Sequence, residues 1–136
     1  MADKARRVDY FTIDIPDQPG EAFKVLAKIK ESGVNLESVT GFPTGGGKGQ
    51  LSVVPEKADK FASAAKAAGL PVGAAKKALF VEGSDRTGAT AEILKRLFDA
   101  RLNLTAFNAA SSRGKFGMIL WFKPETFEAA AKALGA

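Results

Sequence analysis

The spacing of apolar residues changes along the chain, and each change marks a predicted element. Strand-forming residues alternate between Tyr10 and Ile15 and stop at Pro16, which is typical of a strand. Apolar residues then recur at helical spacing over 22–29, which predicts one apolar helix face, and Gly33 ends that helix. The same reasoning predicts, for the rest of the first half, strands at 35–42 and 51–54, a glycine-rich hairpin loop at 44–49, and a helix from 58 that closes at Gly69.

The second half repeats the first at a fixed interval. The turn Asp17-Gln18-Pro19-Gly20 is followed 68 positions later by Asp85-Arg86-Thr87-Gly88, and Asn35-Leu36 is followed at the same interval by Asn103-Leu104. Such a repeat predicts two copies of one supersecondary unit. The elements predicted for the second copy are strands at 78–82, 103–109 and 116–122, and helices whose inward faces fall within 90–97 and 127–134.

The order of elements in each copy is βαββα(β), which predicts an α+β fold. We expect two tandem ferredoxin-like βαββαβ units, with antiparallel sheets and helices on one face, at residues 8–75 and 76–136. Residues 70–75 are either a short fourth strand or a linker, and no residues remain for that strand in the second copy. Because open sheet edges tend to be paired or blunted, we expect another strand to dock there, from the first copy or from a second chain.

The residue types present narrow the chemistry that the protein can perform. The chain has no cysteine and no histidine, so it offers neither a disulfide nor a thiolate or imidazole metal site. Acid–base work would fall to carboxylates, lysines or Tyr10, which favours a protein that is not an enzyme and holds no metal or cofactor. No run of about 20 apolar residues exists, and Met1–Arg7 lacks the apolar core of a secretory signal. We therefore expect a cytoplasmic protein with no membrane partner.

The charge of the chain is mildly basic and unevenly distributed. The formal net charge is +5, and residues 73–136 carry ten Lys or Arg against six Asp or Glu. This excess is compatible with an anionic partner, although a solvated surface is the more common explanation. Charge alone therefore does not choose between a nucleic-acid partner and a small ligand.

The repeated residues are of types that suit a small charged ligand. A glycine at a helix start lets the backbone approach a ligand closely, and free N–H groups of the first helical turn suit a carboxylate. An asparagine side chain offers a donor and an acceptor, and an arginine such as Arg86 can pair with a carboxylate. The same residue types are also ordinary helix caps and turns, so a purely structural role stays open.

The segment from Ile15 to Ala22, followed by Gly33-Val34-Asn35-Leu36, resembles the ACT-domain family. The second copy is similar but looser, since Thr87 replaces the proline and Arg101 replaces the glycine that ends the helix. The resemblance implies a ferredoxin-like fold and regulation by a small metabolite, often an amino acid, bound between paired domains. It also implies a separate enzyme subunit as a partner, and it assigns ligand binding to these residues: Asp17, Gln18, Pro19, Gly20, Asn35, Asp85, Arg86, Thr87, Gly88 and Asn103. We also expect a homodimer, because a second chain would cover the remaining sheet surface and edges.

An alternative resemblance concerns the second copy alone. The segments Leu79–Gly83 and Arg113–Phe122 are similar to the first-strand and third-strand motifs of the RNA-recognition motif, in which exposed aromatics stack on bases. The agreement is incomplete, because Lys115 follows Arg113-Gly114 where an aromatic belongs. Trp121 and Phe122 are predicted to point to opposite faces of one strand, so that one is core and the other is an interface candidate. We therefore expect nucleic-acid binding to be the less favoured function.

Overall fold

The computed structural model describes residues 3–136 and divides into two compact units. Of the described residues, 9–76 form the first unit, and 3–8 together with 77–136 form the second. The break at 76–77 falls one residue from the break expected from the sequence, between 75 and 76. The difference lies near the start of the chain, where residues 3–8 belong with the second copy.

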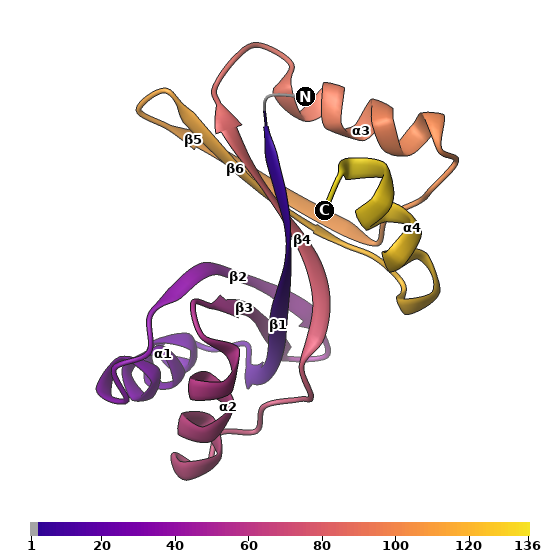
Figure 1. The fold of residues 1–136 in the computed structure, drawn as a ribbon. Coiled ribbons are helices and arrows are strands. Elements are labelled where there is room, and N and C mark those ends of the chain that lie inside the picture. Colours follow the sequence, from indigo (N-terminus) through magenta and orange to yellow (C-terminus); the bar gives the residue numbers. More distant parts are fainter. Residues whose placement is uncertain (1–2) are drawn as a thin grey trace. The chain divides into compact units, whose positions relative to one another are not determined.

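The first unit is a three-stranded antiparallel sheet with two helices against one face. Its order is β2-β3-β1, and Figure 1 shows these strands with α1 and α2. The elements are β1 (Lys4–Pro16, of which residues 9–16 lie in this unit), α1 (Glu21–Glu31), β2 (Leu36–Gly45), β3 (Lys48–Pro55) and α2 (Ala58–Ala67). Residues 70–75, expected as a short strand or a linker, form a single bridge between Val72 and Ile13. The buried core consists of Phe11, Ile13, Ile29, Val34, Leu51, Val53, Phe61 and Ala65.

The hairpin between β2 and β3 is tighter than the sequence predicts. Gly45 pairs with Lys48, so the turn consists of Gly46 and Gly47 alone rather than the whole segment 44–49. These two glycines have φ values of 62° and 77°. Positive φ at both central residues is the requirement of a type I′ turn, whose twist matches that of the flanking strands. The flanking residues of the predicted loop therefore extend the strands.

The second unit contains the other five-element repeat and an additional strand. Its order is β1-β4-β6-β5, with β4 and β5 antiparallel to β6. The elements that follow the linker are β4 (Lys76–Ser84), α3 (Ala89–Asp99), β5 (Ala106–Ser112), β6 (Lys115–Trp121) and α4 (Pro124–Leu134). The buried core beneath the helices consists of Leu79, Val81, Ala89, Ile93, Leu97, Phe116, Met118, Leu120, Phe122, Phe127, Ala130, Ala131 and Leu134. The predicted pair of antiparallel α+β units is thereby confirmed.

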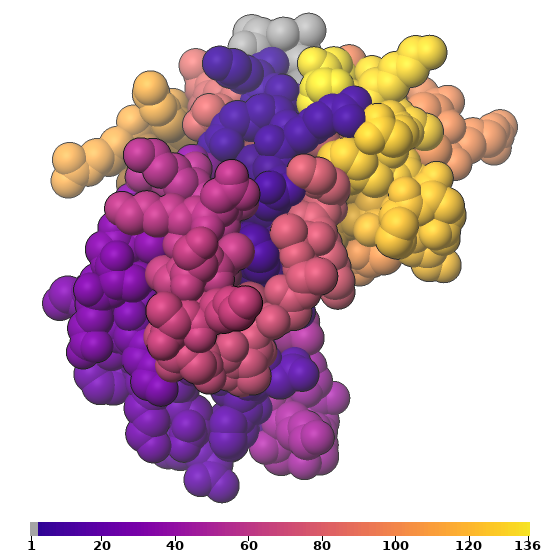
Figure 2. Space-filling model, turned by 60° about the horizontal axis from the view of Figure 1, so that its bottom comes forward, coloured from indigo at the N-terminus to yellow at the C-terminus, as the bar shows by residue number. Residues whose placement is uncertain are grey.

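The strand missing from the second copy comes from the start of the chain. We call residues 3–8 the N-terminal segment; it contains the first half of β1 and lies beside β4. Ala5 packs against the core of the second unit, and the Arg7 guanidinium donates to both carboxylate oxygens of Glu128, at 2.8 and 2.9 Å. Figure 2 shows these indigo residues against the yellow α4. A strand was expected to dock here from the first copy or from a second chain; the structure shows that it is the extension of β1, the first strand of the first copy, into residues that precede that copy.

The two adjacent aromatics at the end of β6 are both buried. Phe122 belongs to the core beneath the helices, as one of the two was expected to do. Trp121 lies outside that cluster but is only 8% exposed. The expectation that the second aromatic would lie open as an interface candidate is therefore wrong for this chain. Because both faces of the strand are buried at this point, the alternation of side chains could not show which of the two aromatics is buried and which is exposed.

Candidate functional site

The two predicted binding loops have the same backbone geometry. In the first unit, the Asp17 N–H donates to the carbonyl oxygen of Gly47 at 2.9 Å. In the second, the Asp85 N–H donates to the carbonyl oxygen of Gly114 at the same distance. Each loop is thus fixed to the β-hairpin of its own unit, and the repeat seen in the sequence is a repeat of local structure.

Each loop leads into a helix through a glycine in the left-handed region. Gly20 has φ 87° and Gly88 has φ 79°, values that residues with a Cβ rarely adopt. No side chain caps either helix start. The first N–H groups of an α-helix have no partner within the helix, and the helix dipole gives them partial positive charge. Both helix starts therefore offer backbone donors to an anion.

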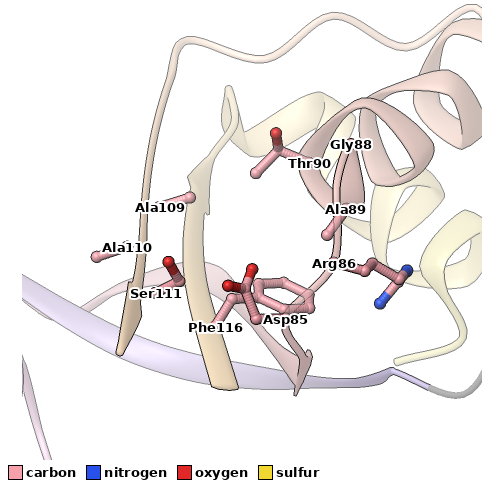
Figure 3. Close-up of a pocket in the computed structure, with 9 residues that line it drawn as sticks. All are labelled: Asp85, Arg86, Gly88, Ala89, Thr90, Ala109, Ala110, Ser111 and Phe116. Carbon is pink, nitrogen blue, oxygen red and sulfur yellow. The ribbon is translucent and has the colours of Figure 1, made fainter. Parts of the chain in front are cut away.

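A cavity of about 190 Å³ adjoins the loop of the second unit, between the start of α3 and the edge strand β5. In Figure 3 the Asp85 carboxylate and the Ser111 hydroxyl lie near one another beside the Phe116 ring, whereas the Arg86 side chain extends away from Ser111. The cavity therefore presents a carboxylate and hydroxyls. Its lining residues are Asp85, Arg86, Gly88, Ala89, Thr90, Ala109, Ala110, Ser111 and Phe116.

Arg86 is bound by carboxylates of its own chain. Its Nη1 and Nη2 donate to the two carboxylate oxygens of Asp3, at 3.0 and 2.8 Å, and its Nε donates to Glu92 at 2.8 Å. Nη1 also donates to the carbonyl oxygen of Ser84 at 3.1 Å. The sequence led us to expect this guanidinium at a ligand carboxylate. The structure shows it with two intramolecular carboxylates, on the side of the loop away from Ser111.

This pairing changes the electrostatics of both partners. The hydrogen bonds from Arg86 hold the pKa of the Asp3 carboxyl below its ordinary value of 3.8, against the opposing effect of burial. The carboxylates of Asp3 and Glu92 in turn raise the pKa of Arg86. The Asp3 side chain is only 1% exposed. A buried carboxylate is tolerated when it is paired and hydrogen-bonded, and the bidentate geometry provides both.

The two predicted asparagines lie outside strands, and their surroundings differ. Asn35 precedes β2, and its Nδ2 donates to Glu56 Oε1 at 2.6 Å. Asn103 lies three residues before β5, which begins at Ala106 rather than at 103 as predicted. Asn35 lines a cavity of about 380 Å³ in the first unit. Asn103 lines one of about 190 Å³ in the second unit, together with Phe98, Arg101 and Leu102.

The structure does not bring the loop and the asparagine of one copy together. In each copy the loop precedes a helix and the asparagine follows the same helix, which has 11 residues. At about 1.5 Å per residue, the two are separated by roughly 16 Å along the helix. Among the described cavities, Asp85, Arg86 and Gly88 share one, while Asn35 and Asn103 each line another. The four loop residues 17–20 line none of them.

Sequence reasoning missed several residues around the second loop. Thr90 and Ser111 contribute hydroxyls to its cavity, and Asp3 binds its arginine from 83 positions earlier in the chain. Thr90 could be recognised from its place in the first helical turn. Ser111 could be placed only through its register opposite Phe116. No local pattern marks Asp3, because its role depends on which sheet the start of the chain joins.

Comparison with known proteins supports the fold and goes no further. No protein-family model matches the chain, and no curated protein matches it. A structure of a Bacteroides thetaiotaomicron protein has a TM-score of 0.82 at 15% identity, over 96% of this chain and 88% of that one. The regulatory subunit of aspartate kinase from Thermus thermophilus has a TM-score of 0.67 at 20% identity, over 99% and 95%. The corresponding subunit from Thermus flavus has a TM-score of 0.64 at 21% identity, over 99% and 95%. The chain therefore has the fold of these regulatory subunits.

The described residues offer little for the other functions considered. The aromatics of the third-strand-like motif, Phe116, Trp121 and Phe122, are all buried, so they present no stacking surface, and the RNA-binding alternative gains no support. Within residues 3–136, no group of three or more acidic side chains is placed to hold a metal ion. None of the helices described is long and apolar enough to cross a membrane.

Proposed function

We propose that this chain is a non-catalytic regulatory pair of ACT-like units that binds a small zwitterion, an amino acid above all. The observation that carries the proposal is the same uncapped, glycine-initiated helix start in both units, each fixed to its hairpin by one backbone hydrogen bond. The fold of the regulatory subunits of aspartate kinase supports this reading. A protein of this type regulates a separate enzyme subunit, and we include such a partner in the proposal.

The two charged ends of a zwitterion would find different partners at each loop. The first-turn N–H groups after Gly20 and Gly88 suit the carboxylate. The acidic side chains Asp17 and Asp85 suit the ammonium group. At the second loop, the hydroxyls of Thr90 and Ser111 add neutral donors and acceptors beside the cavity. The remaining predicted residues, Gln18, Pro19, Asn35, Thr87 and Asn103, stay part of the proposed contact set.

Regulation requires that the ligand bind two arrangements of the protein unequally. A ligand shifts an equilibrium only by its differential affinity for the two states. We propose that the chain forms a homodimer, through which such a shift would be transmitted. Val39 and Phe107 support this idea, because they occupy equivalent positions on the edge strands β2 and β5 and are 44% and 48% exposed.

A thermal-shift screen of the full chain against the twenty amino acids tests the proposal. An amino acid at a hundredfold excess over its Kd should stabilise the protein by about 2.7 kcal/mol, which raises Tm by about 10 °C. Asp85→Asn should reduce the shift if the second loop binds, and Asp17→Asn should do so if the first loop binds. The matched control is Asp99→Asn, since Asp99 lies at the far end of α3, where it pairs with Lys95.

Two results would contradict the proposal. If no amino acid raises Tm while single-stranded RNA binds with an affinity that falls steeply with salt, the nucleic-acid alternative is correct. If an amino acid stabilises the protein equally in the wild type and in both loop variants, the ligand binds elsewhere. Sedimentation of the wild type and Phe107→Ser tests the dimer separately, because loss of the exposed aromatic should weaken it.

A further inference from the structure

The loop of the second unit already holds a carboxylate. Asp3 makes a bidentate ion pair with Arg86, and its side chain is almost fully buried. Gly83 provides the room, since a Cβ at that position would overlap Asp3 Oδ1. The Phe116 ring lies below the guanidinium, 5.8 Å from the Arg86 Cζ to the ring centroid. A guanidinium fork, an aromatic and a gap without a side chain together form a site of carboxylate size.

Each of the residues around Asp3 is replaced by a different residue type at the equivalent position of the first copy. At the equivalent positions 68 residues earlier, Gly83 corresponds to Ile15 and Arg86 to Gln18. The hairpin of the second copy is one residue shorter, and Phe116 pairs with Gly83 as Gly49 pairs with Ile15, so Phe116 corresponds to Gly49. Glu92, which pairs with Arg86, corresponds to Lys24. The loop backbone is the same in both copies, so the site does not follow from the loop geometry. The residues that contact Asp3 therefore form a set that only the second copy possesses.

We propose that Arg86, Gly83 and Phe116 form a carboxylate-binding site that the chain fills with its own Asp3. The N-terminal segment is then a tethered occupant, comparable to a bound ligand. A tethered group has an effective concentration on the order of millimolar or higher, so a free carboxylate that binds more weakly than this does not displace it. While the segment is docked, two carboxylates, Asp3 and Glu92, pair with the single Arg86 guanidinium.

This charge balance gives the two loops different properties. The surplus of negative charge disfavours a second anion at Arg86, so an external carboxylate gains the guanidinium only when the N-terminal segment leaves. The loop at 17–20 carries no such occupant in the described structure. The difference in ligand binding between the two loops rests on the proposed function. The carboxylate site filled by Asp3 does not rest on it and can be tested by itself.

Chemical rescue by formate tests whether the site is a carboxylate site. Asp3→Ala removes one carboxylate and leaves a space of formate size beside Arg86. We expect a lower Tm in chloride, and recovery of roughly half or more of that loss as sodium formate replaces sodium chloride at constant ionic strength. The wild type should show no such response, because Asp3 fills the site. The double variant Asp3→Ala/Arg86→Gln should show none either.

A matched control comes from the same segment. Arg7→Gln removes an ion pair to Glu128 on α4 but leaves Asp3 in place. It should lower Tm without any response to formate. If Asp3→Ala responds to formate no more than Arg7→Gln does, the proposal is overturned.

Amide hydrogen exchange provides a second measurement in case Asp3→Ala does not fold. Asp3→Asn keeps the shape of the side chain, and it should speed exchange both in residues 4–8 and in residues 85–92. Arg7→Gln should speed exchange in residues 4–8 and in α4 but leave 85–92 unchanged. Unchanged exchange at 85–92 in Asp3→Asn would show that the segment does not occupy the loop, and would overturn the proposal by an independent route.

Discussion

Replacement of Gly83 by alanine gives a direct test of the packing around Asp3. A Cβ at this position would overlap Asp3 Oδ1, and it would lie 2.9 Å from Asp3 Cγ and 3.1 Å from Phe116 Cε1. Gly83 does not have a positive φ, so alanine suits its backbone and the effect comes from the crowded side chains. The methyl group must therefore push the Asp3 carboxylate away from Arg86.

The magnitude follows from two opposing effects. An added methyl group in a filled space costs about 1–3 kcal/mol, and exchange of glycine for alanine within a strand returns about 0.5–1 kcal/mol. From the middle of each range, the net loss in the free energy of unfolding is about 1 kcal/mol. With a urea dependence of about 2 kcal/mol/M, the denaturation midpoint should fall by roughly 0.5 M. Trp121, the single tryptophan, lies in the same unit and reports the transition by fluorescence.

Gly117→Ala is the matched control. Gly117 lies on the neighbouring strand β6 and pairs with Glu82, the residue before Gly83 on β4. A Cβ at Gly117 would meet the Phe80 ring at 3.5 Å, an ordinary contact. This variant should keep or raise the midpoint, by up to about 0.5 M. If both variants shift the midpoint in the same direction and by similar amounts, the close packing of Asp3 against Gly83 is not a feature of the protein in solution.

Three further outcomes follow from the same structure. Because Arg86 lowers the pKa of Asp3 in the folded state, the pair stabilises the protein above the unfolded-state value and loses this contribution as pH falls through the folded value. The difference in urea midpoint between wild type and Asp3→Asn should therefore be present at about pH 7 and shrink toward about pH 2. Ile93→Ala, at a fully buried position, should cost about 2–5 kcal/mol in urea denaturation, and Val25→Ala at the equivalent half-buried position should cost less. Gly33→Ala should cost about 1 kcal/mol in the same assay, because its φ is +75°.

The sequence predicted the elements wherever one face is buried against a helix. The spacing of Ile93 and Leu97 in α3, and of Phe127 and Leu134 in α4, follows the helical period, and all four are buried. The repeat then fixed the order of elements, because two matching turns at one interval leave few alternatives. These local features were sufficient to predict the α+β class and the two units.

The extent of the strands was less accessible to sequence reasoning. β1 begins at Lys4 rather than Tyr10, because its first residues pair with β4 of the other copy. That segment is charged, with Arg6 and Arg7 held by ion pairs and by the faces of Phe80 and Phe127. A charged segment lacks the alternation that marks a strand, so only tertiary pairing reveals it.

The candidate site was predicted in part. The loops at 17–20 and 85–88 have the shared geometry that the repeated turn indicated. The sequence could not predict that Asp3 is the partner of Arg86, because this contact depends on the pairing of β1 with β4 and not on any local motif. The asparagines were placed correctly after each helix, but the sequence could not show that Glu56 binds Asn35.

The pairing of the N-terminal segment has a consequence for synthesis. These residues are synthesised before the rest of the unit that they join, and Asp3 meets Arg86 only after 83 further residues have been added. Until then the first half of β1 lacks its partner strand β4 and is exposed to aggregation unless chaperones bind it. Contacts between residues so distant along the chain also slow folding. An expression fragment cut at the repeat boundary, at residue 76, would lack the strand that covers β4 and would be prone to aggregate. An affinity tag is therefore better placed after α4 than before Asp3, where it would adjoin the second loop.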